Sequence, residues 1–138
     1  VRIAGHAGRE DFWEHRAPDD PAYADVDADS NWARWTFRPD GTRRVLKRRP
    51  DGDCTFLGPR GCVLPTEVRP LVCRLYPFAY TESGIHGEDS EYCPHHLFGP
   101  PGVTMLTVLG MRHDDGQRWH RMLYDELRQE HEHPCASA

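Results

Sequence analysis

Proline and glycine interrupt this chain so often that little long regular structure fits into it. Twelve residues of each kind are spread over 138 positions, and both favour turns over the interiors of helices and strands. Apolar and aromatic residues nevertheless recur along the whole length, so a folded chain with a small core is expected rather than a disordered one. The length suits one domain, and we predict a single domain over residues 1–138.

Two segments carry the pattern of a β-hairpin. Residues 32–38 (WARWTFR) and residues 43–49 (RRVLKRR) flank Pro39-Asp40-Gly41-Thr42. An Asp-Gly turn between aromatic and β-branched runs is typical of a hairpin. The bases of the second run indicate a solvated edge strand that its charge protects from aggregation.

The clearest helix is predicted over residues 117–130. Four apolar residues recur there at helical spacing and form one face that we expect to pack on the core. They are Trp119, Met122, Leu123 and Leu127. The predicted fold class is therefore α+β: a small irregular domain, stabilised by metal, with a short β-hairpin and a C-terminal helix.

The remaining segments give shorter predictions. Residues 9–16 are interpreted as a short helix or turn, and residues 81–91 as a polar loop. Residues 66–75 are expected to be helical in two pieces, because Pro70 fits only the first turn of a helix. Pro77 is expected to end the second piece.

The charge balance is mildly acidic. Seventeen Lys and Arg face twenty-two Asp and Glu, for a net charge of −5, so we expect neither nucleic acid nor a membrane as partner. No apolar run approaches the roughly 18 residues that a membrane helix needs, and no signal peptide is visible. The cytosol keeps thiols reduced, and clustered cysteines there more often bind metal or do redox chemistry. We therefore predict a cytoplasmic protein.

Five cysteines are the most informative residues. Seven residues separate Cys54 from Cys62, ten separate Cys62 from Cys73, and nineteen separate Cys73 from Cys93, while Cys135 lies far away. No tight pair of the zinc-knuckle type and no Cys-x-x-Cys motif occurs, so spacing alone leaves a metal site and buried, inert thiols both open. Turn-forming or charged neighbours favour stabilised thiolates over inert thiols. A reversible disulfide, Cys54–Cys62 or Cys62–Cys73, is a third possibility.

The text around these cysteines resembles a known family. It reads Cys54-Thr-Phe-Leu57, then Cys62-Val-Leu-Pro65, then RPLVCRLYPF over residues 69–78, then Cys93-Pro94. Residues 51–96 are similar to the bacterial cysteine-cluster proteins of the CxxCxxCC type, which are described as zinc- or iron-chelating. The Arg-Pro-x-x-Cys-Arg-x-Tyr-Pro-Phe run is the most specific part of the resemblance.

The resemblance implies a metal centre. Its expected ligands are the thiolates of Cys54, Cys62, Cys73 and Cys93, around either an iron–sulfur cluster or zinc. His95 or His96 stands where the family tends to have glycine and could add a nitrogen ligand.

Four neighbouring residues would surround the ligands. Arg74 could offset thiolate charge, and Arg69 could pair with an acid or bind a carbonyl. Ordinary surface charge is the alternative for both arginines. Tyr76 and Phe78 could shield the site from water, with ordinary core packing as the favoured alternative.

Two points of the resemblance leave the activity open. The family's dense N-terminal cysteine cluster is absent, and the chain begins at Val1, so we expect a chain truncated at its N-terminus. The same cysteine pattern is similar to part of the flagellin lysine-N-methylases. A redox-active enzyme or a methylase-like activity is therefore the alternative to a metal-chelating protein. The residues identify no catalytic group, no methyl-donor site and no protein partner.

Overall fold

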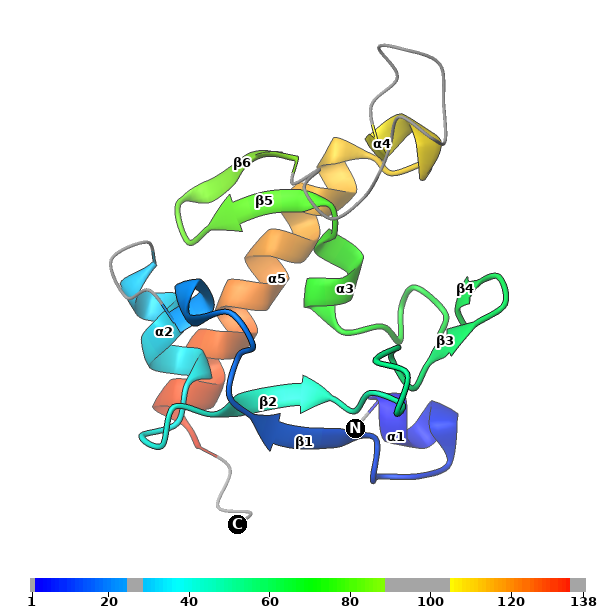
Figure 1. Cartoon of the computed structure of the whole chain (residues 1–138). Coiled ribbons are helices and arrows are strands. Elements are labelled where there is room, and N and C mark those ends of the chain that lie inside the picture. The colour runs from blue at the N-terminus through cyan, green and yellow to red at the C-terminus, as the bar shows by residue number, and fades with distance from the viewer. Residues whose placement is uncertain (1, 25–28, 89–104, 135–138) are drawn as a thin grey trace. The chain divides into compact units, whose positions relative to one another are not determined.

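The computed structural model describes residues 2–24, 29–88 and 105–134 (Figure 1). The chain forms two compact units, residues Val1–Arg69 and Pro70–Ala138. Among the described residues, all sheets are two-stranded and antiparallel, and helices are present in both units. The predicted α+β class and the C-terminal helix are confirmed, and short antiparallel hairpins are present at other residues than predicted. Stabilisation by metal stays a prediction. A single domain over residues 1–138 stays a prediction.

The first unit combines two short helices, a 3-10 turn and two small sheets. In chain order its elements are α1 (Arg2–Ala7), β1 (Trp13–Arg16), η1 (Pro21–Ala24), α2 (Ser30–Thr36), β2 (Arg43–Leu46), β3 (Leu57–Gly58) and β4 (Gly61–Cys62). Strand β1 pairs with β2 so that Trp13 lies opposite Leu46 and Arg16 opposite Arg43. Strands β3 and β4 form a minimal hairpin across the turn at Pro59 and Arg60, as the Gly-Pro-Arg-Gly text suggests.

A compact apolar cluster holds the first unit together. Phe12, Phe56 and Leu64 are buried at its centre, and the rings of Phe12 and Phe56 lie 5.8 Å apart at a tilted angle. Residues from α1 and β2 pack around them, and so does Cys54. Burial of such large apolar side chains is the main source of stability in a unit this small.

The predicted hairpin over residues 32–49 is wrong. Residues 30–36 form helix α2 instead, because Asp29 caps it: its side chain accepts the backbone N–H of Trp32 at 3.1 Å. The Asp-Gly turn does exist, closed by bonds from Arg38 N to Thr42 O and from Gly41 N to Arg38 O. It connects a helix to a strand, and β2 takes its partner from residues 13–16, which were predicted as helix or turn.

The second unit packs a hairpin and a short helix against one long helix. Its described elements are α3 (Leu71–Leu75), β5 (Phe78–Thr81), β6 (Gly84–Glu88), α4 (Met105–Val108) and α5 (His113–Glu132). Helix α5 packs against both α3 and β6 (Figure 1). The predicted polar loop over residues 81–91 is wrong for its first part, because residues 84–88 pair with β5 around a tight turn at Glu82 and Ser83.

The prolines bound α3 as predicted, but the first of the two predicted helical pieces is wrong, because residues 66–69 form a turn in which Val68 N and Arg69 N donate to Pro65 O. Pro70 occupies the N-cap of α3, and the helix ends at Leu75, two residues before Pro77. Leu75 and Pro77 are among the most buried side chains of the described residues. The proline-bounded helix therefore supplies part of the core of the second unit.

Helix α5 confirms the predicted C-terminal helix and extends it at both ends. Leu123 is buried as predicted, whereas Trp119, Met122 and Leu127 are half-buried. The face is completed by Gly116, which sequence periodicity did not single out. A Cβ built on Gly116 would lie 2.5 Å from a ring carbon of Phe78, so only glycine lets the ring lie this close to the helix.

Candidate metal centre

Cys54 lies in the first unit, between β2 and β3. Its backbone forms an isolated bridge with Arg48, and its half-buried side chain packs on the apolar cluster. The backbone N–H of Phe56 points at its Sγ atom over 3.5 Å. A backbone N–H that donates to a cysteine sulfur from two residues further along the chain favours negative charge on that sulfur. A thiolate ligand needs such stabilisation.

Cys62 ends strand β4 in the same unit. It lies opposite Leu57 in the hairpin register, and its thiol is exposed. The guanidinium of Arg69 donates from Nε to Leu64 O over 2.8 Å and from Nη2 to Cys62 O over 3.4 Å. Carbonyl binding, one of the roles expected for Arg69, is therefore present in the structure.

Cys73 lies on the exposed side of α3 in the second unit. Its neighbour Arg74 is buried, with 9% of its surface exposed, so the reading of Arg74 as ordinary surface charge is wrong. Phe78 is buried as core packing predicts, whereas Tyr76 is 40% exposed and is not a core residue. Tyr76 and Cys73 are three residues apart, close to one turn of this short helix.

The described residues hold only part of the predicted ligand set. Cys93, His95 and His96 lie outside them. Within residues 2–24, 29–88 and 105–134, no group of three or more His, Cys, Asp or Glu side chains could hold a metal ion. Cys54 and Cys62 are free thiols rather than a disulfide pair.

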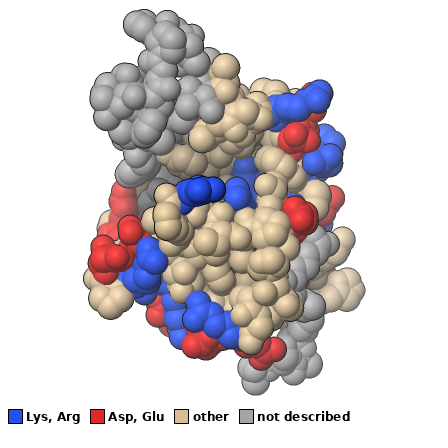
Figure 2. Space-filling model, turned by 90° about the vertical axis from the view of Figure 1, so that its right-hand side faces the viewer, with Lys and Arg blue, Asp and Glu red and all other residues tan. Residues whose placement is uncertain are grey.

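Acidic side chains pair with the bases at the end of the basic run 43–49, just after β2. Arg48 pairs with Asp19 at 3.5 Å, and Arg49 lies 3.9 Å from Asp51 and 3.6 Å from Asp53. Figure 2 shows the same mixing of blue and red side chains on the face that it draws. Such a surface fits the predicted charged edge strand, since β2 belongs to a sheet of only two strands.

Two aromatic rings cover further bases of this sheet. The guanidinium of Arg44 lies 5.1 Å from the ring centre of Trp13, and that of Arg43 lies 5.6 Å from the ring centre of Phe37. Each cation–π contact at such a distance contributes about 0.5–1 kcal/mol at an exposed site. These bases therefore serve the fold of the first unit.

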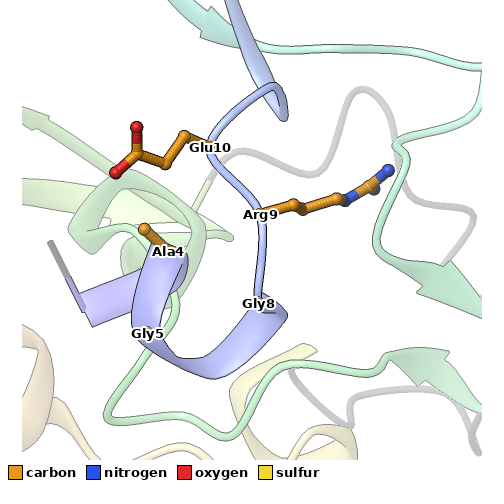
Figure 3. A pocket seen from close by; sticks show the side chains of 5 residues that line it. All are labelled: Ala4, Gly5, Gly8, Arg9 and Glu10. Carbon is orange, nitrogen blue, oxygen red and sulfur yellow. The ribbon is translucent and has the colours of Figure 1, made fainter.

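A shallow hollow beside α1 offers no second site. It is lined by Ala4, Gly5, Gly8, Arg9 and Glu10. Figure 3 shows the side chains of Arg9 and Glu10 extending in opposite directions rather than converging. Arg9 is held by a 3.0 Å bond to the Thr55 hydroxyl and lies over the Phe56 ring. A ligand site needs convergent polar groups, and this hollow has none among its lining residues.

Sequence reasoning missed a polar cluster on the β5–β6 hairpin. The Thr81 hydroxyl lies 2.7 Å from His86 Nε2 and 2.8 Å from the Ser83 hydroxyl. The backbone carbonyl of Thr81 accepts a 2.7 Å bond from His120 Nε2 of α5. The cluster ties the hairpin to the helix. The predicted polar loop missed this cluster, although the Glu-Ser-Gly text between Tyr80 and Ile85 is a usable hairpin signal.

Comparison with known proteins gives no relative: no family model, curated protein or solved structure matches the chain. Membership of the cysteine-cluster family therefore stays a prediction that rests on the residues 51–96. In the part of the chain that the structure describes, no helix combines the length and apolar character needed to cross a bilayer.

Proposed function

We propose that this protein is a cytoplasmic metal-chelating protein that binds an iron–sulfur cluster or a zinc ion. Its proposed ligands are Cys54, Cys62, Cys73 and Cys93, with His95 or His96 as a further candidate. The observation that carries the proposal is the Cys54 sulfur, which already has a backbone N–H directed at it over 3.5 Å. Hydrogen bonds to a ligating sulfur favour its charged form and tune the bound metal.

The chemistry of four thiolates suits this choice of metals. Four sulfurs satisfy tetrahedral zinc, and four cysteines are also the usual ligands of iron–sulfur clusters. The spacing of seven, ten and nineteen residues fits ligands brought together by a fold rather than by one tight knuckle. Hard cations such as Ca²⁺ and Mg²⁺ prefer oxygen ligands and are poor candidates for such a set.

Exposed apolar side chains accompany the exposed thiols, which is a second argument for this site. Leu57 and Val63 adjoin Cys62 and are 39% and 61% exposed. Val72 and Tyr76 adjoin Cys73 and are 43% and 40% exposed. An apolar surrounding limits the access of water to a metal–thiolate centre and so controls its potential and its lability.

Metal binding is also expected to stabilise the chain. Ligands must be deprotonated and ordered when the metal binds, so part of the binding free energy becomes folding free energy. The apolar cluster of the first unit centres on three buried residues, Phe12, Phe56 and Leu64. A unit with so small a core gains proportionally more from a metal than a large domain would.

Metal analysis of the protein purified without oxygen tests the proposal. Iron, zinc and acid-labile sulfide are measured per chain, together with the visible absorption spectrum. Iron with sulfide and a broad visible band would identify a cluster, and zinc alone would identify a structural centre. A folded protein free of both metals would refute the proposal and favour the redox alternative, which counting free thiols before and after reduction would then examine.

Single substitutions make this measurement specific. Cys54→Ser or Cys62→Ser is expected to lower the metal content, because each removes one proposed thiolate. Cys135→Ser is the matched control, since this cysteine lies far along the chain from the others and outside the proposed set. Equal metal content in all variants would mean that the metal is held elsewhere.

A further inference from the structure

The β3–β4 hairpin, which contains Cys62, is too short to be stable by its own hydrogen bonds. Strands β3 and β4 have two residues each, and their register joins Leu57 to Cys62 and Gly58 to Gly61. One further bond, from Val63 N to Phe56 O over 2.9 Å, extends the ladder. Isolated two-stranded hairpins are marginally stable in water, so a hairpin of this length needs support from outside its ladder.

Arg69 supplies that support on the far side of Cys62. Its Nε donates to Leu64 O over 2.8 Å and its Nη2 donates, over a longer 3.4 Å, to the carbonyl of Cys62 itself. Leu64 is only 2% exposed, so this end of the segment is anchored in the core. The backbone of Cys62 is therefore held by the β3–β4 hydrogen bonds on one side and by the Arg69 guanidinium on the other.

Arg69 is itself held in place by the turn that precedes it. Both Val68 N and Arg69 N donate to Pro65 O, over 2.9 Å and 3.1 Å. This turn brings the guanidinium back over residues 62–64. A guanidinium presents several N–H donors in one rigid plane, whereas lysine has a single ammonium at the end of a flexible chain. Lysine at this position could not reproduce both bonds in the same geometry.

We infer that Arg69 is a positioning residue that fixes the Cys62 backbone for metal binding. This inference deepens the proposed function and rests on it. Ordering a ligand before the metal arrives removes part of the entropic cost of binding. Residues that orient metal ligands typically change metal affinity by about 10–100-fold when they are replaced.

Zinc affinity of the full chain, measured by competition with a chromophoric chelator, tests the inference. Arg69→Lys keeps the charge and is expected to weaken zinc binding by about 10-fold. Arg60→Lys is the matched control, because Arg60 lies in the exposed turn of the same hairpin. Both variants are first compared with the parent protein by circular dichroism to establish that they fold.

A double-variant comparison separates positioning of Cys62 from a general loss of structure. In a Cys62→Ser background, Arg69→Lys is expected to cause no further loss of affinity, because the residue that it positions has gone. In a Cys73→Ser background the loss should persist. An unchanged affinity in Arg69→Lys, or an equal loss in both backgrounds, would overturn the inference.

A second readout does not depend on metal and separates this inference from the proposed function. In the zinc-free protein, the Val63 amide should exchange its hydrogen at least several-fold faster in Arg69→Lys than in Arg60→Lys. A parent protein that binds neither zinc nor iron would refute the proposed function, whereas faster Val63 exchange in Arg69→Lys would still show that Arg69 stabilises this segment. Equal Val63 exchange rates in Arg69→Lys and Arg60→Lys would contradict the role of Arg69 in stabilising this segment.

Discussion

A single exposed carboxylate closes the turn that leads into β2. Asp40 accepts the hydroxyl of Thr42 at 2.6 Å and its backbone N–H at 3.0 Å. These bonds, the hydroxyl first, hold the pKa of Asp40 below its usual value of 3.8, and the charges of Arg38 and His15 lower it further. Because the folded pKa is depressed, the contribution to stability exists above the unfolded pKa and is lost as the pH falls through the folded pKa.

Replacing the hydroxyl should therefore raise the pKa of Asp40. Thr42→Val removes the side-chain donor but keeps the backbone N–H and the β-branched shape, so the pKa should move part of the way back toward its usual value. The carboxyl titration is followed by NMR, and the other carboxyl groups in the same spectra are the internal control. A titration of Asp40 that is the same in both proteins would contradict the assignment of the shift to Thr42.

At the scale of elements, the sequence predicts a helix or a helix end correctly where the residues that determine it lie in the same segment. The apolar stripe of α5 and the prolines that bound α3 are of this kind, and both predictions are confirmed. Strand β2 is the opposite case, because its partner β1 lies about thirty residues earlier and no local pattern names it. Because an Asp-Gly turn lies just before β2, the sequence wrongly predicted residues 32–38, on the other side of that turn, as its partner strand.

The candidate site shows the same division. The cysteines and Arg69 could be named from the sequence, but the two carbonyls that Arg69 binds follow from the turn at Pro65 and had to be seen. The exposure of Cys73 beside the buried Arg74 depends on which side of α3 faces the core, and a helix of five residues is too short for its periodicity to settle this.

The cap of α2 decides that residues 30–36 are helical. Asp29→Ala is expected to destabilise the chain by about 1 kcal/mol, because it removes the acceptor for Trp32 N. Asp29→Ser is the matched control, since a serine oxygen can cap the helix equally well. Urea unfolding of the three proteins measures the difference, and equal midpoints for alanine and the parent chain would exclude a stabilising cap.

The contact between Gly116 and Phe78 predicts an unusual result for a helix. Alanine normally favours a helix over glycine by about 1 kcal/mol, yet Gly116→Ala should destabilise the chain by about 1–3 kcal/mol because its Cβ meets the Phe78 ring. Gly5→Ala in α1 is the control, because nothing lies within 4 Å of its added Cβ. Thermal unfolding should separate the two variants, and a stabilised Gly116→Ala would contradict the close packing of β5 on α5.

At the scale of the whole molecule, the proposed ligands come from both compact units. Cys54 and Cys62 belong to the first unit and Cys73 to the second. A metal that binds the folded chain and not the unfolded chain should raise the free energy of unfolding. Removing the metal with a chelator is accordingly expected to lower the unfolding temperature. The Cys135→Ser variant should respond to the chelator as the parent protein does.

X-ray absorption spectroscopy of the metal-loaded protein tests the central claim most directly, because it counts the atoms around the metal. For zinc we predict four sulfur neighbours at about 2.3 Å, and for an iron–sulfur cluster a sulfur shell with a neighbouring iron. Cys62→Ser should remove one protein sulfur from that shell, and Cys135→Ser should remove none. A shell of nitrogen and oxygen atoms, or a sulfur count that no cysteine substitution changes, would contradict the assignment of these cysteines as metal ligands.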